Sequence, residues 1–373
     1  MIELSISTRE SIEEVAELEE EWRQLHADCS YQSVFNGFDF FMASISVFPA
    51  ADTKLYVLVA TGVTGVAAIF PFQRSRIRNT WGRLWQLEYA AQWESDKLYP
   101  LIRRGFEEAA WLALAQYLSA NRAYWDRLQL VEIPEGLAAT SALQRAFRPP
   151  HYWVRVGDDN VSPIIGLDRP WSERWQGHRK MRKKVARMQN AFGDRMRFQV
   201  FDGKEDWRTC IGLYLELESK GWKAGRVGIG KDEYTSLFYW NFLSRLAVRN
   251  GLRIGILFID ETPVAAEIAY VEGSKVYFSH GTYDESFSTY SPGMVSTCLF
   301  LQYFHDGTYV DGDFLAGYAG YMTPWADRML GSRKLQILRI SPRLLLLFPD
   351  KVKRKLLRRK RNKGRKSNRR TSL

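Results

Sequence analysis

The sequence predicts an α/β protein made of two similarly folded domains in tandem, each with mixed strands flanked by helices, followed by a basic tail. Two observations support this fold class. The chain has 373 residues, enough for two domains of ordinary size. Strand-like and helix-like runs also occur in the same order in both halves, which is typical of an internal repeat.

In the first half, alternating and helical periodicities define ten elements. Strands are expected at 2–7, Lys54–Ala60, Val66–Phe72, Trp85–Tyr89, Trp125–Ile133 and His151–Val156, and helices at Ser11–Asp28, Phe38–Val47, Arg103–Ser119 and Leu137–Phe147.

In the second half, a basic helix at Ser172–Phe192 leads into the same order of elements. Strands are expected at Met196–Phe201, Leu252–Ile259, Pro263–Val271, Lys275–Tyr283, Thr308–Asp311 and Leu335–Ile340, and helices at Asp206–Lys220, Lys231–Arg249, Pro292–His305 and Met322–Leu330. We therefore predict two domains, 1–160 and 161–342, and a tail, 343–373.

The charge distribution separates a nearly neutral body from a basic end. Thirteen of the 53 Lys and Arg residues lie in 351–373, so residues 1–350 hold 40 basic residues against 42 acidic ones. We expect the tail to be disordered and, through Leu344–Phe348 and its cations, to contact an anionic membrane surface. RNA binding and simple solubility are alternatives that the sequence leaves open.

Cysteine usage and hydropathy bear on the compartment. The three cysteines include no pair at metal-ligand spacing, so neither a disulfide framework nor a metal site is expected. The first residues lack the basic start and apolar run of a signal peptide, and no apolar run approaches the ~20 residues that span a bilayer. These features favour a cytoplasmic protein, placed at the inner face of the membrane if the tail binds there.

The start of the helix after the third strand is suited to an anion. Ser291 is a good N-cap residue, Pro292 fits the first helical position, and the turn through Gly293, Met294 and Val295 contains no Asp or Glu. Its N–H groups are therefore available to a phosphate. An ordinary Ser-Pro helix start is the alternative.

Four short motifs resemble the CelD-like (cellulose-biosynthesis-associated) acetyltransferases of the GNAT superfamily. They are Glu218 to Gly225 (ESKGWKAG), Tyr283-Asp284-Glu285, Ser291-Pro292-Gly293, and Asp313 to Trp325 with Tyr321 between them. The resemblance covers about 165–340 most strongly. It implies a GNAT-like domain that uses acetyl-CoA or another acyl-CoA as cosubstrate, and the repeated order of elements then predicts two such domains. The cofactor is expected at the Pro292 helix of the second domain only, because the first half has no counterpart of Ser291-Pro292-Gly293.

The resemblance also assigns roles to individual residues. It implies catalytic roles for Tyr283, Asp284 and Tyr321, and substrate contacts for Trp222, Lys223, His280, Asp313 and Trp325. Lysines that commonly precede and follow two of the family's motifs are replaced here by His280 and Met322. Any role that depends on those lysines is in doubt, although a histidine can itself act as a base near neutral pH.

An amine acceptor must lose a proton before it attacks a thioester, so a general base is needed. Glu218 continues an apolar helical stripe and is the first candidate; a structural ion pair with a nearby lysine is the alternative. Glu267 is the second candidate, with Ala265 and Ala269 on its face of a strand, although an orientation towards solvent ranks slightly ahead.

The basic helix carries seven Lys and Arg residues between Arg174 and Arg187. Arg179 and Arg182 are expected to contact CoA phosphates or an anionic acceptor, and a solvated basic face is the alternative.

Taken together, the residues and the resemblance predict an acyl-CoA-dependent acyltransferase whose acceptor is an amino sugar or an envelope polysaccharide precursor. A Fem-type transferase that takes aminoacyl groups from tRNA is one alternative. A catalytically silent scaffold of a polysaccharide-synthesis complex is another.

Overall fold

The computed structural model describes residues 2–47, 53–79, 82–90, 95–202, 206–221, 227–318 and 322–341. Trp222, Lys223, Tyr321 and the tail lie outside these ranges.

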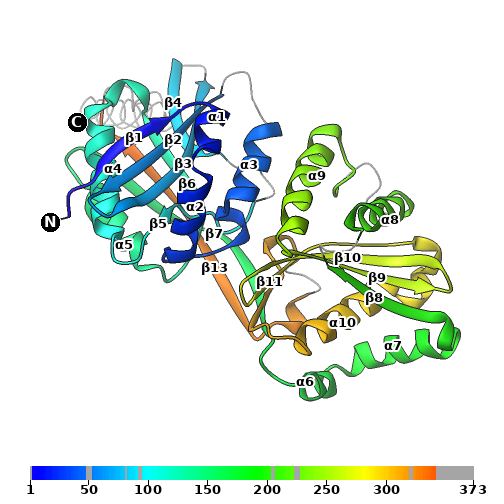
Figure 1. The fold of residues 1–373 in the computed structure, drawn as a ribbon. Coiled ribbons are helices and arrows are strands. Elements are labelled where there is room, and N and C mark those ends of the chain that lie inside the picture. Colours follow the sequence, from blue (N-terminus) through cyan, green and yellow to red (C-terminus); the bar gives the residue numbers. More distant parts are fainter. Residues whose placement is uncertain are drawn as a thin grey trace, which may run out of the picture.

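The first half contains two groups of helices and seven strands (Figure 1). The helices are α1 Ile12–Ala16, α2 Glu19–Asp28, α3 Phe38–Val47, α4 Glu107–Ala120 and α5 Ala138–Ala146. The strands are β1 Ser5–Arg9, β2 Thr53–Gly62, β3 Gly65–Asn79, β4 Gly82–Tyr89, β5 Leu101–Ile102, β6 Arg127–Pro134 and β7 Tyr152–Gly166.

The second half repeats this order after a pair of linking helices. Its helices are α6 Trp171–Gly177, α7 Arg179–Phe192, α8 Trp207–Lys220, α9 Glu233–Val248 and α10 Pro292–His305. Its strands are β8 Met196–Asp202, β9 Leu252–Ile259, β10 Thr262–Glu272, β11 Lys275–Tyr283, β12 Asp311–Asp313 and β13 Arg328–Arg339.

All of these strands join one continuous sheet. Its order is β1-β2-β3-β4-β6-β13-β7-β12-β11-β10-β9-β8, with β5 paired to β3. Each half contains one parallel contact at an equivalent place, β4 with β6 and β11 with β12, whereas the other pairs are antiparallel. The predicted repeat is therefore present in the topology as well as in the element order.

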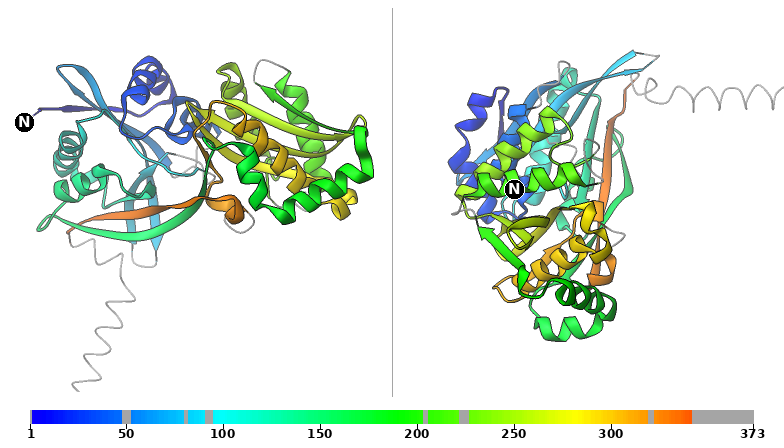
Figure 2. Two further views of the ribbon diagram at one scale, coloured as in Figure 1. Left: turned by 90° about the horizontal axis from the view of Figure 1, so that it is seen from below. Right: turned by 90° about the vertical axis from the view of Figure 1, so that its right-hand side faces the viewer.

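The two halves exchange their last strands. β13 follows the second half in sequence, yet it lies between β6 and β7 in the sheet of the first half. β7 in turn continues past β13 and pairs with β12 of the second half. Figure 2 shows these two long strands running side by side from one half into the other.

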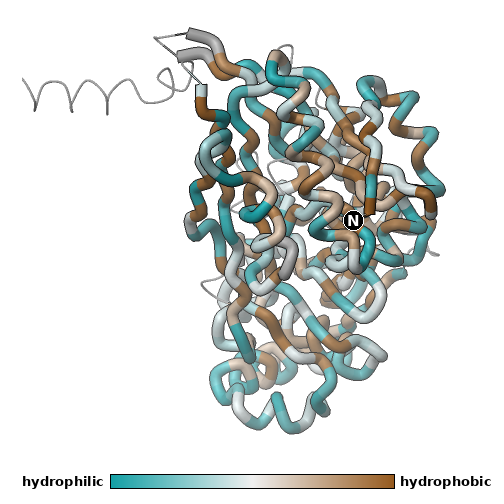
Figure 3. The backbone as a smooth tube through the Cα atoms, turned by 90° about the vertical axis from the view of Figure 1, so that its left-hand side faces the viewer, coloured by the Kyte–Doolittle hydropathy of each residue, from teal (hydrophilic) through white to brown (hydrophobic). Residues whose placement is uncertain are grey.

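The halves also share a hydrophobic core. Phe40 of α3 packs edge-on against Phe238 and Phe242 of α9, with ring centroids 5.5 and 5.2 Å apart. Phe35 meets Tyr277 of β11 in the same way. Figure 3 shows the hydrophobic segments concentrated in the interior and the hydrophilic ones mainly at the periphery. Burial of aromatic surface at this junction stabilises the arrangement of the two halves.

Several expected elements differ from the structure. The helix expected at Met322–Leu330 is wrong, because only the short 3-10 helix η6 (Thr323–Trp325) forms and β13 begins at Arg328. The long basic helix is broken into α6 and α7 at His178, whose φ and ψ of −101° and 57° are not helical. β7 extends ten residues beyond the expected end at Val156 because β12 and β13 supply partners that the local sequence does not reveal.

Candidate active site

An opening in the sheet lies between β11 and β12. β11 pairs with β10 as far as Tyr283, but its parallel pairing with β12 covers only Lys275–Tyr277. From Phe278 onwards, no strand of the described residues pairs with the other edge of β11. β11 and β12 therefore diverge beyond Tyr277, and an extended ligand can lie along a strand where its neighbour has diverged.

A β-bulge lies beside this opening. The β10–β11 register shifts between Ile268 and Ala269, which leaves Ser279 as the extra residue of β11. The Ser279 hydroxyl donates to the Tyr270 hydroxyl at 2.8 Å and lies 2.6 Å from Nδ1 of His280. In the tautomer with the proton on Nδ1, the ring donates to Ser279 and Nε2 carries the lone pair.

His280 is oriented by a second contact. The ring of Tyr239, from α9, meets the imidazole edge-on at 4.8 Å between centroids. The side chain is half-buried. The strand histidine is thus held in position by the Ser279 hydroxyl and the Tyr239 ring.

Glu267 does not face solvent, so that expectation is wrong. It is 8% exposed and points to the α10 side of the sheet, where the Thr297 hydroxyl lies 2.6 Å from its Oε1. A Cβ on Gly281 would lie 2.7 Å from Oε2, so the carboxylate occupies the space that a glycine leaves free. Ala265 and Ala269 line the same face, as expected.

Glu218 is buried and held by the chain that precedes α9. Its carboxylate accepts from the Gly230 amide at 2.7 Å and the Ile229 amide at 3.2 Å, and from the Tyr214 hydroxyl at 3.3 Å. The lysine ion pair considered from the sequence does not form with Lys220, which pairs with Glu216 instead. These contacts anchor a loop, and a catalytic role for Glu218 stays a prediction.

Tyr283 packs against the start of α10. A Cβ on Gly293 would lie 2.9 Å from Cδ1 of Tyr283, so the glycine allows the ring to approach. Asp284 follows in the chain and is the N-cap residue of the 3-10 helix η4 (Glu285–Tyr290), where it accepts from the amide and the hydroxyl of Ser286.

The N-terminus of α10 has the expected form with one difference. Pro292 is the first helical residue, and the first turn contains no acidic residue. Ser291 is the N-cap residue but has φ 56° and makes no side-chain capping bond; its hydroxyl accepts from Lys184 Nζ at 2.7 Å. The amides of Gly293 and Met294 have no intrahelical acceptor, whereas that of Val295 bonds to Ser291.

Basic side chains of α7 flank this helix start. Besides Lys184, the Arg187 guanidinium lies 5.7 Å from the centroid of the Tyr290 ring. Arg179 and Arg182 are exposed on the same helix. α7 therefore places positive charge beside the N-terminus of α10, where the helix dipole also favours an anion.

A buried cluster of Asp96, Lys97, Ser162 and Asp313 joins the two halves, and we call it the junction cluster. The Lys97 ammonium lies 2.8 Å from Asp313 and 3.0 Å from Asp96. Although burial opposes its charge, the two carboxylates raise the pKa of Lys97, and burial raises the pKa of Asp313. Asp313 was expected from the resemblance, but no motif distinguished Asp96 or Lys97.

Trp325 lies in an aromatic stack away from solvent. Its ring is 2% exposed and stacks on Trp171 and His178, at 5.9 and 3.9 Å between centroids. Its carbonyl accepts from Arg174. A substrate contact for Trp325 stays a prediction.

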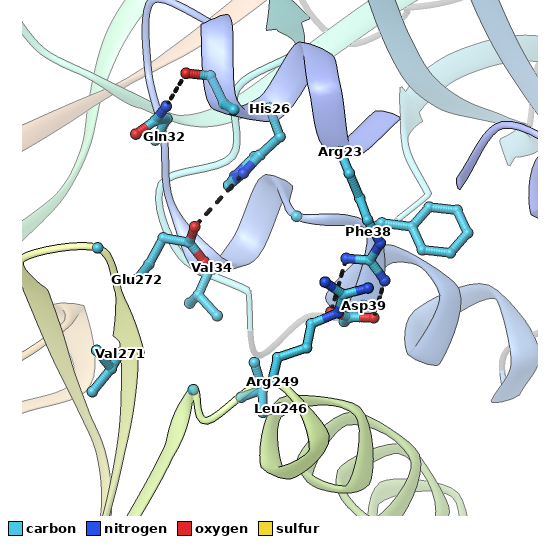
Figure 4. Close-up of a pocket in the computed structure, with 14 residues that line it drawn as sticks. Arg23, His26, Gln32, Val34, Phe38, Asp39, Leu246, Arg249, Val271 and Glu272 are labelled. Atoms are coloured by element: carbon cyan, nitrogen blue, oxygen red, sulfur yellow. Dashed lines mark hydrogen bonds and ion pairs between the residues drawn. The ribbon is translucent and has the colours of Figure 1, made fainter. Parts of the chain in front are cut away.

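A polar pocket of about 450 Å³ lies between the halves (Figure 4). Arg23 and Arg249 both bind Asp39 on its wall, and His26 of α2 faces Glu272 at 3.7 Å. The pocket lies at the β10–β11 turn, about 13 Å along β11 from the bulge at Ser279, estimated from the strand rise. We do not assign it to the active site.

The described part of the chain contains no group of three or more His, Cys, Asp or Glu side chains that could hold a metal ion. Its helices are all too short or too polar to span a membrane.

Comparison with known proteins adds a family match and a fold. Residues 179–322 match the sequence model of the acetyltransferase (GNAT) domain. No curated protein matches the chain.

Solved structures are similar over nearly the whole chain. FemX is 10% identical, with 88% of this chain and 98% of that chain covered and a TM-score of 0.56. A conserved protein of unknown function from Bacteroides thetaiotaomicron is 12% identical, with 91% and 100% covered and a TM-score of 0.56. The C-terminal domain of a putative lysylphosphatidylglycerol synthetase from Agrobacterium fabrum is 13% identical, with 89% and 95% covered and a TM-score of 0.53.

At these identities the structural matches establish the fold and nothing more. The chain thus has a tandem GNAT-like α/β fold, and its residues 179–322 match a GNAT acetyltransferase domain.

Proposed function

We propose that this protein is an acyl-CoA-dependent N-acyltransferase whose active site is the opening between β11 and β12. The observation that carries the proposal is the position of that opening. It lies between a helix N-terminus suited to phosphate and an oriented histidine, within the segment that matches the acetyltransferase domain.

The residues around α10 fit a CoA cosubstrate. The amides of Gly293 and Met294, with Lys184 beside them, would bind the pyrophosphate of CoA. Arg179 and Arg182 would attract the phosphate on the ribose of CoA. The pantetheine arm is an extended amide chain, which suits the stretch of β11 from Phe278 onwards, where β12 has diverged from it. The thioester would then lie near the bulge at Ser279.

The reaction needs one bond made, one broken and two proton transfers. The neutral amine attacks the thioester carbonyl, the new C–N bond forms, the C–S bond breaks, and the thiolate takes a proton. His280 is the proposed base, because Ser279 and Tyr239 hold its ring at the opening, and the tautomer that donates from Nδ1 to Ser279 has its lone pair on Nε2. Tyr321, which the resemblance implies as the proton donor to the thiolate, lies outside the described residues.

The acceptor class rests on the resemblance to CelD-like acetyltransferases, which points to an amino sugar or an envelope polysaccharide precursor. A saccharide acceptor would enter from the α8–α9 side of the sheet, where His280 and Tyr239 meet. Attachment to an anionic membrane through 343–373 remains part of this proposal.

One observation favours a second candidate, aminoacyl transfer from tRNA. The basic helix α7 exposes Arg179, Lys180, Arg182, Lys183 and Arg187, which suits a nucleic acid backbone. A second observation opposes this candidate. Only twelve residues separate the end of α8 at Lys220 from the start of α9 at Glu233, which is too few for the long helical hairpin usual in Fem-type transferases.

Release of CoA thiol from acetyl-CoA tests the proposed reaction. Hydroxylamine serves as a small, neutral acceptor at pH 7, and glucosamine tests the amino-sugar class. We expect the wild type to accelerate transfer to hydroxylamine, and His280→Gln to lower turnover about 100-fold or more. The matched variant His151→Gln, in the loop before β7, should keep full activity. Release at the uncatalysed rate by folded wild type would refute the proposal.

A further inference from the structure

We propose that Asp96 and Lys97, contributed by the first half of the chain, are positioning residues for acyl transfer in the second half. Together with Asp313 they fix the turn Asp313–Ala316, which forms one side of the opening between β11 and β12. This inference rests on the proposed function, because the opening is the active site assigned there.

The Lys97 ammonium is fully used within the junction cluster. It donates to Asp96 Oδ1 at 3.0 Å, to Asp313 Oδ2 at 2.8 Å and to Ser162 Oγ at 2.8 Å. An ammonium group has three N–H donors, so none remains for a substrate. Its side chain is 3% exposed. Lys97 therefore holds other groups in place and does not itself bind a ligand.

The second oxygen of each carboxylate holds the turn after β12. Asp313 Oδ1 accepts from the Leu315 amide at 2.8 Å, and Asp96 Oδ2 accepts from the Ala316 amide at 2.8 Å. The Lys97 ammonium thus holds both carboxylates, and the carboxylates hold the successive amides of Leu315 and Ala316 in the second half. One of those carboxylates, like the ammonium, comes from the first half.

The turn needs this support because its backbone is strained. Leu315 has φ 57°, a left-handed conformation that is unfavourable for an L-residue with a side chain. Its side chain is 9% exposed and packs in the core shared by the two halves. Burial of this side chain and the two hydrogen bonds hold a conformation that the residue does not prefer.

The position of the turn links the cluster to the reaction. Asp313 pairs with Tyr277, where the parallel pairing of β12 with β11 ends. The chain then stays beside β7, where the Phe314 amide donates to the Pro163 carbonyl, while β11 continues to the bulge at Ser279, about 7 Å further along. The turn therefore sets the separation of the two strands beside Ser279 and His280, where the acyl group would be held.

A charge-matched double variant tests the inference on the full-length protein. Lys97→Met leaves two buried carboxylates unpaired and can prevent folding, whereas Lys97→Met/Asp313→Asn keeps the formal charge of the cluster at −1. Arg249→Met is the control, because it removes a different ion pair between the halves, with Asp39 at 3.1 Å. Each protein is measured by amide hydrogen exchange, by calorimetric titration with acetyl-CoA, and by CoA release with hydroxylamine.

We expect the double variant to lose at least tenfold in protection at the Leu315 and Ala316 amides and at least tenfold in turnover. Its affinity for acetyl-CoA should stay within twofold of wild type, because the phosphate site at α10 is untouched. The control should match wild type in all three measurements. This split between turnover and affinity would not arise from general destabilisation.

The outcomes separate the two proposals. Three results would each overturn the positioning role and leave the acyltransferase proposal unaffected. They are unchanged protection at both amides, full turnover in the double variant, and equal losses of affinity and turnover. A folded wild type that neither binds acetyl-CoA nor accelerates its reaction with hydroxylamine would refute the acyltransferase proposal and, with it, the positioning role.

Discussion

Lys97→Met should destabilise the protein severely, because it removes the single cation of the junction cluster. Lys97 is 2% exposed, and the carboxylates of Asp96 and Asp313 that contact it are 5% and 7% exposed. Removing one partner of a buried ion pair typically costs about 3–5 kcal/mol, since the remaining charge is left without compensation. Here two carboxylates are left, so we expect a loss at the upper end of that range.

Urea unfolding measures this loss. With a slope of about 2–3 kcal/mol per M, a loss of about 4–5 kcal/mol lowers the unfolding midpoint by about 1.3–2.5 M. The double variant Lys97→Met/Asp313→Asn should recover part of the loss, because it removes one of the two unpaired charges and leaves only Asp96 without its cation. A midpoint for Lys97→Met within 0.3 M of wild type, roughly the error of such comparisons, would refute the inference that the ammonium compensates buried carboxylates.

Three further predictions follow from single contacts. Gly281→Ala should lower the free energy of unfolding in urea by about 1–3 kcal/mol, because the new Cβ would lie 2.7 Å from Glu267 Oε2. Gly157→Ala, whose Cβ meets nothing within 4 Å, is the control, and equal effects of the two variants would contradict the reasoning. Glu218→Gln should raise hydrogen exchange at the Ile229 and Gly230 amides, because an amide side chain cannot accept from both; unchanged exchange would remove its role as a loop anchor. Although burial opposes it, the Gly166 amide and Arg174 hold the pKa of Asp327 below 3.8, so its stabilisation is present above that pH and lost as pH falls through the lowered value. Asp327→Asn should therefore be less stable than wild type at pH 7, with a difference that shrinks as pH falls below 3.8, and a constant difference would contradict this.

Local sequence patterns predicted the elements that depend on local interactions. The three antiparallel strands β9 to β11 and the helix α10 appear within about one residue of their expected bounds, because short turns and the Ser-Pro start define them. The exchange of β7 and β13 could not be predicted in this way. Which strand pairs with β6 depends on contacts between residues some 200 positions apart, and alternation of apolar residues does not carry that information.

The candidate site was predicted in part. Ser291, Pro292 and Gly293 stand at the helix start as expected, although the Ser291 hydroxyl binds Lys184 and does not cap the helix. The burial of Glu267 was missed, because it depends on Gly281 in the neighbouring strand and Thr297 in α10. Lys97 was missed because two of its three partners, Ser162 and Asp313, come from distant segments, and no local pattern marks such a lysine. A positive-φ residue at position 315 is likewise visible only in the folded chain.

Calorimetric titration of the full-length protein with acetyl-CoA tests the central claim most directly. The account predicts binding with a Kd in the micromolar range, about −8 kcal/mol, which weakens with rising salt because phosphates are held partly by α7. Lys184→Met, which removes the cation beside Ser291, should weaken binding about threefold to tenfold, whereas Lys54→Met at the start of β2 should not change it. No binding in a sample shown to be folded would contradict the acyltransferase assignment, and salt-sensitive binding of tRNA by the same sample would favour aminoacyl transfer.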